Sequence, residues 1–289
     1  MNCRLDSTKH LPHTNSIYLI PVRLLLLVFI LALAKASSAS DTLQLFREIP
    51  LKARLMTVDE TGNVYIVREN NSLVKFSDQG DSIAFYRSVQ NGDIGAVDAS
   101  NPLRVIVTYP SYSKLVILDR MLAQKNELDL RRLNIFTSPV VAASADGNLW
   151  IYDRFNARLL KIDEQLNKIV ESNDLRLQLQ NVPDPVFMVE RDWKVYLADT
   201  ARGIFSFDRY GNHVNTIALT GISYLQVLGT RMIYRKEDSL HSWDLTKMVS
   251  DLMMIPARTA SIVNAAIVRN TLYVLYTDRL VLYRMKARP

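Results

Sequence analysis

Short runs of aliphatic, β-branched and aromatic residues alternate with polar turns along most of the chain. The stretch DGNLWIYDRFNARLLKID (146–163) holds two such runs, LWIY and RLLKI, with the polar turn DRFNA between them. Asp146-Gly147-Asn148 supplies residues that tolerate positive φ, as a tight turn requires. A third run, PVVAASA (139–145), comes before it and is rich in small side chains. The pattern predicts three consecutive antiparallel strands.

The same order of runs and turns recurs, so the stretch is one of six copies. The residue before the middle run of each copy follows its predecessor by 37 to 46 positions. The other five copies are TGNVYIVRENNSLVKFS (61–77), PLRVIVTYPSYSKLVILD (102–119), DWKVYLADTARGIFSFD (192–208), GTRMIYRKEDSLHSWD (229–244) and RNTLYVLYTDRLVLYR (269–284).

Both faces of the later strand in each copy are largely apolar, which indicates sheets that are covered on both sides. A period of about 40 residues with three to four strands per unit is typical of a β-propeller. The sequence therefore predicts an all-β, six-bladed propeller as a single domain over 37–289. The predicted blades lie near 52–95, 96–136, 137–182, 183–220, 221–258 and 259–289.

The last copy ends at its third strand, so its sheet would lack an outer strand. The segment TLQLFREIPL (42–51) precedes the first blade and has no partner within it. We expect this segment to complete the last blade and to close the ring. The small residues of PVVAASA suit the innermost strand, where the blades converge.

The N-terminus resembles a secretory signal peptide, which we place at 1–36. Basic residues precede the apolar run 24–34, and the small-residue stretch KASSAS follows it. The alternative is a retained anchor, but eleven residues make only about 16 Å of helix, about half of a hydrocarbon core. We expect export to the periplasm, the cell envelope or the outside, with no stable membrane span after cleavage.

Composition narrows the possible chemistry. The chain has 289 residues, of which 48% are hydrophobic and 22% charged, and its only cysteine, Cys3, falls in the predicted leader. The remainder then has no thiol for a disulfide, a metal site or a nucleophile. Without the leader the net charge falls from +6 to about +3, which gives little electrostatic reason to bind nucleic acid. We expect a monomer.

At PVVAASADGNLWIYDRFNARLLKIDEQLNKI (139–169) the chain resembles an NHL repeat. The resemblance lies in a proline-led inner strand, an Asp-Gly turn, an aromatic strand ending in Asp, an Asn-x-Arg turn and a strand closing in Asp. It is looser at 52–85 and 185–217, and the other copies keep only spacing and polarity. The resemblance implies a six-bladed propeller. NHL-like propellers serve as protein-binding modules, as RNA binders inside cells, and occasionally as lyases or lactonases.

The residues that could carry catalysis are few. Aspartates close the later strand in several copies, at Asp119, Asp163, Asp208 and Asp244. Carboxylates bind calcium, but an Asp after a strand commonly accepts hydrogen bonds from its own turn, and we expect that structural role. His213 and His241 fall at an outer edge and on an apolar face, so we expect no catalytic residue, no metal and no cofactor.

The turns between the second and third strands should open on the face where propellers usually bind ligands. Arginine and tyrosine are frequent there, and both are enriched in binding hot spots; the alternative is that these are solvated loop tips. The candidate binding residues are Arg68, Tyr109, Tyr112, Asp153, Arg154, Asn156, Asp199, Arg202 and Arg235.

The sequence favours an exported, non-catalytic binding or scaffold propeller whose partner is a protein or another envelope component. The alternative is a metal-dependent propeller hydrolase or lyase, similar to a lactonase, and an RNA-binding role is third. Four triplets resemble the acceptor for O-glycans in exported Bacteroidetes proteins: Asp41-Thr42-Leu43, Asp81-Ser82-Ile83, Asp199-Thr200-Ala201 and Asp238-Ser239-Leu240.

Overall fold

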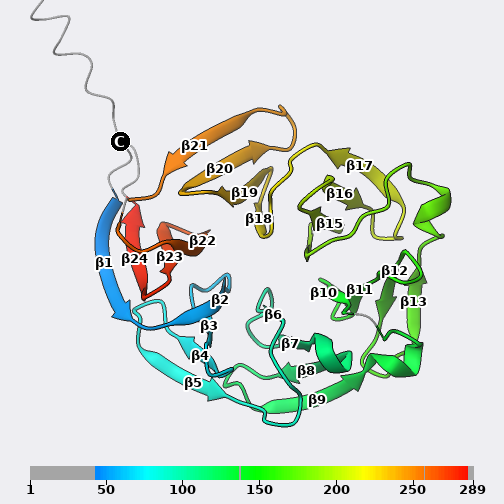
Figure 1. Cartoon of the computed structure of the whole chain (residues 1–289), viewed down its shortest axis with the longest axis horizontal. Coiled ribbons are helices and arrows are strands. Elements are labelled where there is room, and N and C mark those ends of the chain that lie inside the picture. Colours follow the sequence, from blue (N-terminus) through cyan, green and yellow to red (C-terminus); the bar gives the residue numbers. More distant parts are fainter. Residues whose placement is uncertain (1–42, 137, 257, 286–289) are drawn as a thin grey trace, which may run out of the picture. The chain divides into compact units, whose positions relative to one another are not determined.

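Six four-stranded antiparallel sheets form a ring around a central axis (Figure 1). The structure is a computed structural model that describes residues 43–136, 138–256 and 258–285. The predicted leader at 1–36 and Cys3 lie outside the described residues. The predicted all-β, six-bladed propeller is confirmed.

Each blade runs from an inner strand next to the axis to an outer strand on the rim. The strands of blades 1 to 3 are β2 (Ala53–Val58), β3 (Val64–Arg68), β4 (Leu73–Phe76) and β5 (Ser82–Tyr86); β6 (Ala96–Asp98), β7 (Val105–Tyr109), β8 (Lys114–Leu118) and β9 (Gln124–Asp129); and β10 (Val140–Ala143), β11 (Leu149–Asp153), β12 (Arg158–Ile162) and β13 (Lys168–Glu171). Short 3-10 helices are η1 (Pro110–Tyr112), η2 (Leu130–Leu133) and η3 (Leu175–Leu177).

The other three blades repeat this meander, and the sixth takes its outer strand from the N-terminal side. The strands of blades 4 to 6 are β14 (Phe187–Arg191), β15 (Lys194–Asp199), β16 (Gly203–Phe207) and β17 (His213–Ile217); β18 (Leu225–Leu228), β19 (Arg231–Lys236), β20 (Ser239–Asp244) and β21 (Ser250–Met254); and β22 (Ile262–Val268), β23 (Thr271–Tyr276), β24 (Arg279–Met285) and β1 (Leu43–Pro50).

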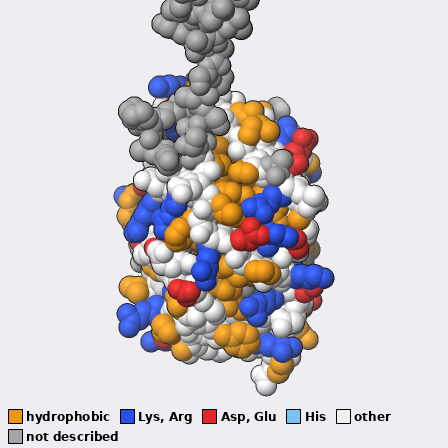
Figure 2. Space-filling view, turned by 90° about the vertical axis from the view of Figure 1, so that its left-hand side faces the viewer, with side chains coloured by type: hydrophobic (Ala, Val, Ile, Leu, Met, Phe, Trp, Pro, Cys, Tyr) orange, Lys and Arg blue, Asp and Glu red, His pale blue; other side chains and the backbone are white. Residues whose placement is uncertain are grey.

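Strand β1 lies on the outside of blade 6 and pairs antiparallel with β24, from Leu43 opposite Met285 to Pro50 opposite Arg279. Glu48 of β1 accepts a hydrogen bond from Arg279 and forms an ion pair with Arg258 at 3.1 Å. Figure 2 shows this side of the molecule, where apolar, basic and acidic side chains are interspersed. The first and last strands of the ring therefore share one sheet.

The hydrophobic core lies between the blades, and each cluster of buried side chains joins two neighbours. Ile66 of blade 1 packs in one cluster with Leu275 and Leu282 of blade 6. Trp150 of blade 3 packs with Phe205 of blade 4. Every sheet thus has a neighbour on each side, which explains why both faces of its central strands are apolar.

The aspartates that close the third strands hold the turns that follow. The Asp208 carboxylate accepts hydrogen bonds from the backbone N–H groups of Tyr210 and Asn212, at 2.8 and 2.9 Å. Asp119 and Asp163 likewise accept hydrogen bonds from the backbone N–H groups of the residues two and four positions later in the chain. The structural role predicted for these residues is confirmed.

Asp244 makes the stability of the turn after β20 dependent on pH. Hydrogen bonds from the Thr246 hydroxyl and from backbone N–H groups lower the pKa of Asp244 to about 2. The pKa in an unfolded chain is about 3.9, so this stabilisation is complete above that value and is lost as pH falls through about 2. We expect the urea midpoint of unfolding to fall over this range, and to fall less steeply in Asp244→Asn. Equal slopes in the two proteins would contradict this expectation.

Candidate functional site

One face of the ring collects the longer connections. Because consecutive strands are antiparallel, the turns after each second strand and the loops between blades emerge on the same side. We call this side the loop face. It comprises the turns 69–72, 110–113, 154–157, 200–202, 237–238 and 277–278 and the described residues of the interblade loops, 87–95, 130–136, 138–139, 172–186, 218–224, 255–256 and 258–261.

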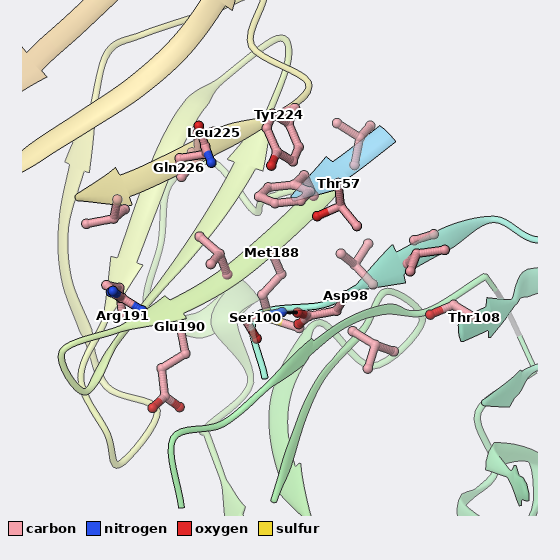
Figure 3. A pocket seen from close by; sticks show the side chains of 18 of the residues that line it. Thr57, Asp98, Ser100, Thr108, Met188, Glu190, Arg191, Tyr224, Leu225 and Gln226 are labelled. Atoms are coloured by element: carbon pink, nitrogen blue, oxygen red, sulfur yellow. Dashed lines mark hydrogen bonds between the residues drawn. The ribbon is translucent and has the colours of Figure 1, made fainter. Parts of the chain in front are cut away.

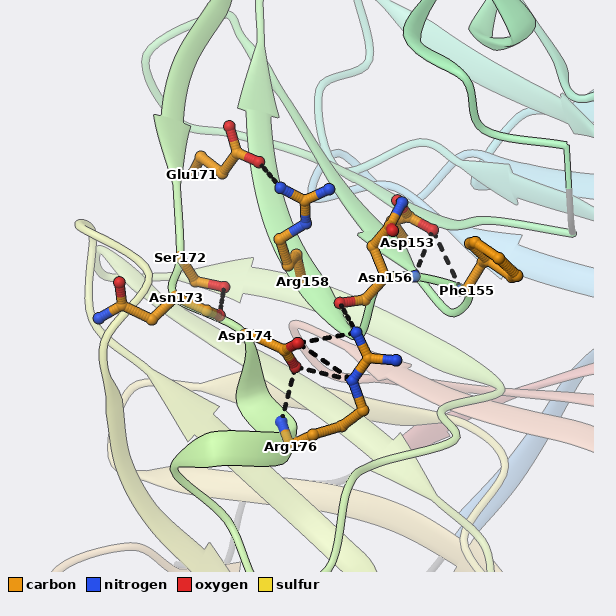
Figure 4. A network of polar contacts seen from close by, with 9 residues as sticks. All are labelled: Asp153, Phe155, Asn156, Arg158, Glu171, Ser172, Asn173, Asp174 and Arg176. Atoms are coloured by element: carbon orange, nitrogen blue, oxygen red, sulfur yellow. Dashed lines mark hydrogen bonds and ion pairs between the residues drawn. The ribbon is translucent and has the colours of Figure 1, made fainter.

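Two of the predicted binding carboxylates are buried on this face and hold its turns. Asp153 accepts hydrogen bonds from the N–H groups of Phe155 and Asn156 and from the Asn156 side chain, the last at 2.6 Å (Figure 4). Asp199 does the same for the turn at Arg202, whose guanidinium it also binds at 3.0 Å. Both aspartates are about 2% exposed. They shape the loop face but offer a partner no surface.

Tyr109 was predicted to be a binding residue, but its side chain is fully buried and cannot contact a partner. It belongs to the core between blades 1 and 2, and its hydroxyl donates to that of Tyr86 at 3.3 Å. Burial raises the pKa of Tyr109 well above its usual value. Tyr109 is the last residue of β7, whose five residues are all buried because neighbouring blades cover both faces of the sheet, and the turn begins one residue later.

The other candidates reach solvent but do not form one cluster. Tyr112 and Arg202 are exposed, and Arg68 and Asn156 are half-buried. Arg154 and Arg235 instead line two overlapping cavities between the inner strands, which are described below. Arg154 binds the Asp184 carboxylate and the Pro185 carbonyl.

Three large apolar side chains on the loop face were not among the predicted residues. Phe136, Phe155 and Leu177 are 66%, 74% and 86% exposed. Phe155 follows Arg154 directly in the turn DRFNA, and Phe136 lies in the loop before β10. Their apolar character was visible in the sequence, but only the fold shows that they are not used in the core.

A polar network fixes the turn that carries Phe155 (Figure 4). Arg176 pairs with Asp174 at 2.7 Å and reaches the Asn156 carbonyl at 3.4 Å. The pairing lowers the pKa of Asp174. The N–H of Leu175 donates to the Ala157 carbonyl at 3.0 Å. The turn and the next interblade loop are thereby held together, so Phe155 is presented on an ordered backbone.

The six inner strands surround a cavity of about 430 Å³ (Figure 3). Its lining runs from Glu60 and Arg191 on the side of the inner-strand turns to Ser138 and Arg154 on the loop face. A second cavity of about 350 Å³ shares part of this lining and opens toward Arg54. We call this second cavity the loop-side chamber; its shared residues include Thr57, Gly95, Ala96, Val97, Val186, Phe187 and Tyr224.

Polar side chains of the inner strands connect successive blades. Asp98 of blade 2 accepts a hydrogen bond from the N–H of Ala143 in blade 3, at 2.7 Å. Gln226 of blade 5 accepts one from Ile267 in blade 6, at 2.8 Å. Asn264 of blade 6 donates to the Met56 carbonyl of blade 1 at 3.0 Å. These groups are used to hold the ring.

Glu190, at the end of β14, makes the corresponding link from blade 4 back to blade 3. Its carboxylate accepts from the Ser144 hydroxyl at 2.6 Å, from the Ala145 N–H at 3.1 Å and from the Trp150 indole N–H. The residue is about 8% exposed and Trp150 is fully buried. Hydrogen bonds to a carboxylate are stronger than those between neutral groups, so these three bonds hold blades 3 and 4 together firmly.

An aromatic pair lies in the wall of the chamber. The rings of Phe187 and Tyr224 are 4.9 Å apart and tilted by 60°. The Tyr224 hydroxyl interacts with the Thr57 side chain of blade 1, and both residues lie in the same part of the cavity wall (Figure 3). Burial raises the pKa of Tyr224 to about 12. Tyr224 therefore stays protonated at neutral pH and can donate a hydrogen bond.

The two described histidines lie away from this cavity. His213 begins the outermost strand β17, where its ring lies 5.6 Å from that of Phe207 and burial lowers its pKa. His241 in β20 stacks on Tyr234 at 5.3 Å. Within residues 43–136, 138–256 and 258–285, no three His, Cys, Asp or Glu side chains are grouped to hold a metal ion.

Comparison with known proteins supports the fold and does not identify a family. No protein-family model and no curated protein matches the chain. Among solved structures, virginiamycin B lyase from Staphylococcus aureus is similar with a TM-score of 0.58 at 12% identity, over 85% of this chain and 100% of that one. BamB from Moraxella catarrhalis is similar with a TM-score of 0.51 at 12% identity, over 86% and 99% of the two chains.

The Pan2 WD40 domain of Neurospora crassa is similar with a TM-score of 0.55 at 9% identity, over 86% of this chain and 97% of that one. At such identities the likeness shows the fold alone, and propellers of this kind carry unrelated functions. Within the part of the chain that the structure describes, no helix is long and apolar enough to cross a membrane. The chain is a β-propeller with six blades.

Proposed function

We propose that this chain is an exported, non-catalytic binding propeller that holds a protein partner against its loop face. The observation that carries the proposal is the set of exposed aromatic side chains there, Tyr112, Phe136 and Phe155. Large exposed aromatic groups beside arginine are the composition of protein-binding hot spots. Single apolar residues on a surface are ordinary, but these three aromatic side chains come from blades 2 and 3 and the loop between them, whereas the exposed aromatic side chains in turns of the opposite face, Trp193 and Tyr210, both belong to blade 4.

The hydrogen bonds of the carboxylates on the inner strands also favour a binding role for the protein over a hydrolase activity. Asp98 and Glu190, both in the cavity lining, accept hydrogen bonds from neighbouring blades, so neither is free to act as a base without weakening the ring. Both described histidines lie in the outer half of their blades. A histidine-based mechanism would need such a group aimed into the cavity.

The proposal includes export of the chain from the cytoplasm and a relationship to NHL-repeat propellers. The apolar run 24–34 with its basic flank is the argument for export. The Asp-Gly and Asp-x-x-Asn turns of blade 3, at 146–147 and 153–156, are the argument for an NHL-like repeat. The Asp-Ser/Thr triplets suggest a Bacteroidetes-type source. We expect a monomer whose partner belongs to the cell envelope.

Site-specific photocrosslinking in the native envelope tests which face binds. A photoreactive phenylalanine at position 112 or 155 on the loop face should yield one shared covalent product. The same group at Met121 or Trp193, which are 55% and 46% exposed in turns of the opposite face, is the matched control and should give none. Equal products from both faces, or turnover of a lactone by the purified protein, would overturn the proposal.

A further inference from the structure

The loop-side chamber has the size and walls of a small-molecule site. Its volume of about 350 Å³ falls within the range of roughly 300–1,000 Å³ typical of such sites. Leu55, Val97 and Val263 line it together with the Phe187 and Tyr224 rings. A flat apolar group could therefore lie against an aromatic surface while largely removed from water.

Two arginines line the same chamber, one from each of the two blades that flank blade 6. Arg54 comes from β2 of blade 1 and Arg235 from β19 of blade 5. Arg54 donates to the Asn71 side chain at 2.8 Å. Arg235 donates to the carbonyls of Glu237 and Val263, at 2.6 and 3.4 Å. All these acceptors are neutral, so they orient the guanidinium groups without balancing their charge.

Neither arginine of this chamber forms an ion pair with a described carboxylate, although Asp98 lies close enough to contribute to the raised pKa of Tyr224. Arg154, in contrast, pairs with Asp184. The described residues that line the chamber include these two arginines and no Asp or Glu. A guanidinium has five N–H donors, and the bonds above use one on Arg54 and two on Arg235. Donors for an anion remain on both.

We propose that the loop-side chamber binds a small organic anion with a flat apolar body, of the aromatic carboxylate class. The carboxylate is placed between Arg54 and Arg235, where planar guanidinium groups match its geometry. The ring lies against Phe187 and Tyr224, and the protonated Tyr224 hydroxyl is a further donor. This site is distinct from the exposed aromatic residues of the loop face, so either proposal can fail without the other.

Calorimetric titration with 1-naphthoate, and with the uncharged 1-naphthamide as a matched probe, tests the site. We expect saturable binding of naphthoate that is weakened by added salt. Arg54→Gln and Arg235→Gln should each lower the affinity for naphthoate by about tenfold, because each removes a charge-assisted hydrogen bond, and should leave naphthamide unchanged. Ala96→Phe, which fills the chamber, should abolish both.

Arg87→Gln is the matched control, since Arg87 is exposed in the loop 87–95 of the same face and does not line the chamber. It should bind naphthoate as the unaltered chain does, and melting temperatures should show that all variants fold. Absence of saturable naphthoate binding, equal affinity for naphthamide, or unchanged affinity in both arginine variants would overturn the proposal.

Discussion

Removal of residues 43–50, the whole of β1, is expected to lower the melting temperature of the propeller by about 10 °C or more. The deletion leaves β24 as an exposed edge over its entire length. It also removes Ile49 and Leu43 from the cores on either side of blade 6. Arg279 and Arg258 lose the Glu48 carboxylate that they share. Calorimetry of the chain from residue 37 onward, with and without residues 43–50, measures the effect.

Deletion of only residues 37–42, which precede β1, is the control and should leave the melting temperature unchanged. Glu48→Gln keeps the strand but weakens its ion pairs, so a smaller decrease is expected and the test remains decisive if the full deletion does not fold. If the chain without β1 melted at the same temperature as the intact one, β1 would not contribute to closure of the ring.

Glu190→Ala should be the most damaging single substitution in the inner strands. It leaves the Trp150 indole N–H, the Ser144 hydroxyl and the Ala145 N–H without their acceptor. Each unsatisfied buried donor costs about 1–3 kcal/mol, so we expect a loss of about 3–5 kcal/mol in the free energy of unfolding. Urea denaturation followed by tryptophan fluorescence measures it.

Glu171→Ala provides the matched comparison, because Glu171 pairs with Arg158 and Lys168 on the rim. Ion pairs near the surface contribute about 0–1 kcal/mol, so this variant should remain close to the unaltered chain. Glu190→Gln should fall between the two, since an amide retains one acceptor oxygen. If Glu190→Ala were no less stable than Glu171→Ala, the bonds to Trp150 and its neighbours would contribute little.

The features that depend on local patterns could be predicted from the sequence. The number of blades follows from the recurring apolar runs and polar turns. The turn-stabilising role of Asp163 and Asp208 depends only on backbone N–H groups two and four positions later in the chain. Tyr109 could not be placed from its turn, because the pattern does not fix the residue at which β7 ends, and every residue of that strand is buried between neighbouring blades.

The loop-side chamber was not predictable, because its charged groups meet only in the closed ring. Arg54 and Arg235 belong to blades 1 and 5 and are 181 positions apart in the sequence. Arg235 was among the candidates only as a turn residue, and Arg54 was missed because it is the second residue of a strand, where no turn draws attention to it. Glu190 was missed for a related reason, since FMVER shows a polar strand end but not the three donors that face it.

From the pairing of β1 with β24 we expect the closure of blade 6 to be a late step in folding. Leu43 must find Met285, a contact between chain segments about as distant as this propeller allows, and contacts of that kind form slowly because a long loop has to close first. Synthesis delivers N-terminal segments first, so β1 is made long before its partner. Until β24 arrives, Leu45 and Phe46 stand on an unpaired strand that can associate with other chains. Ring closure is thus the step at which aggregation and correct folding compete.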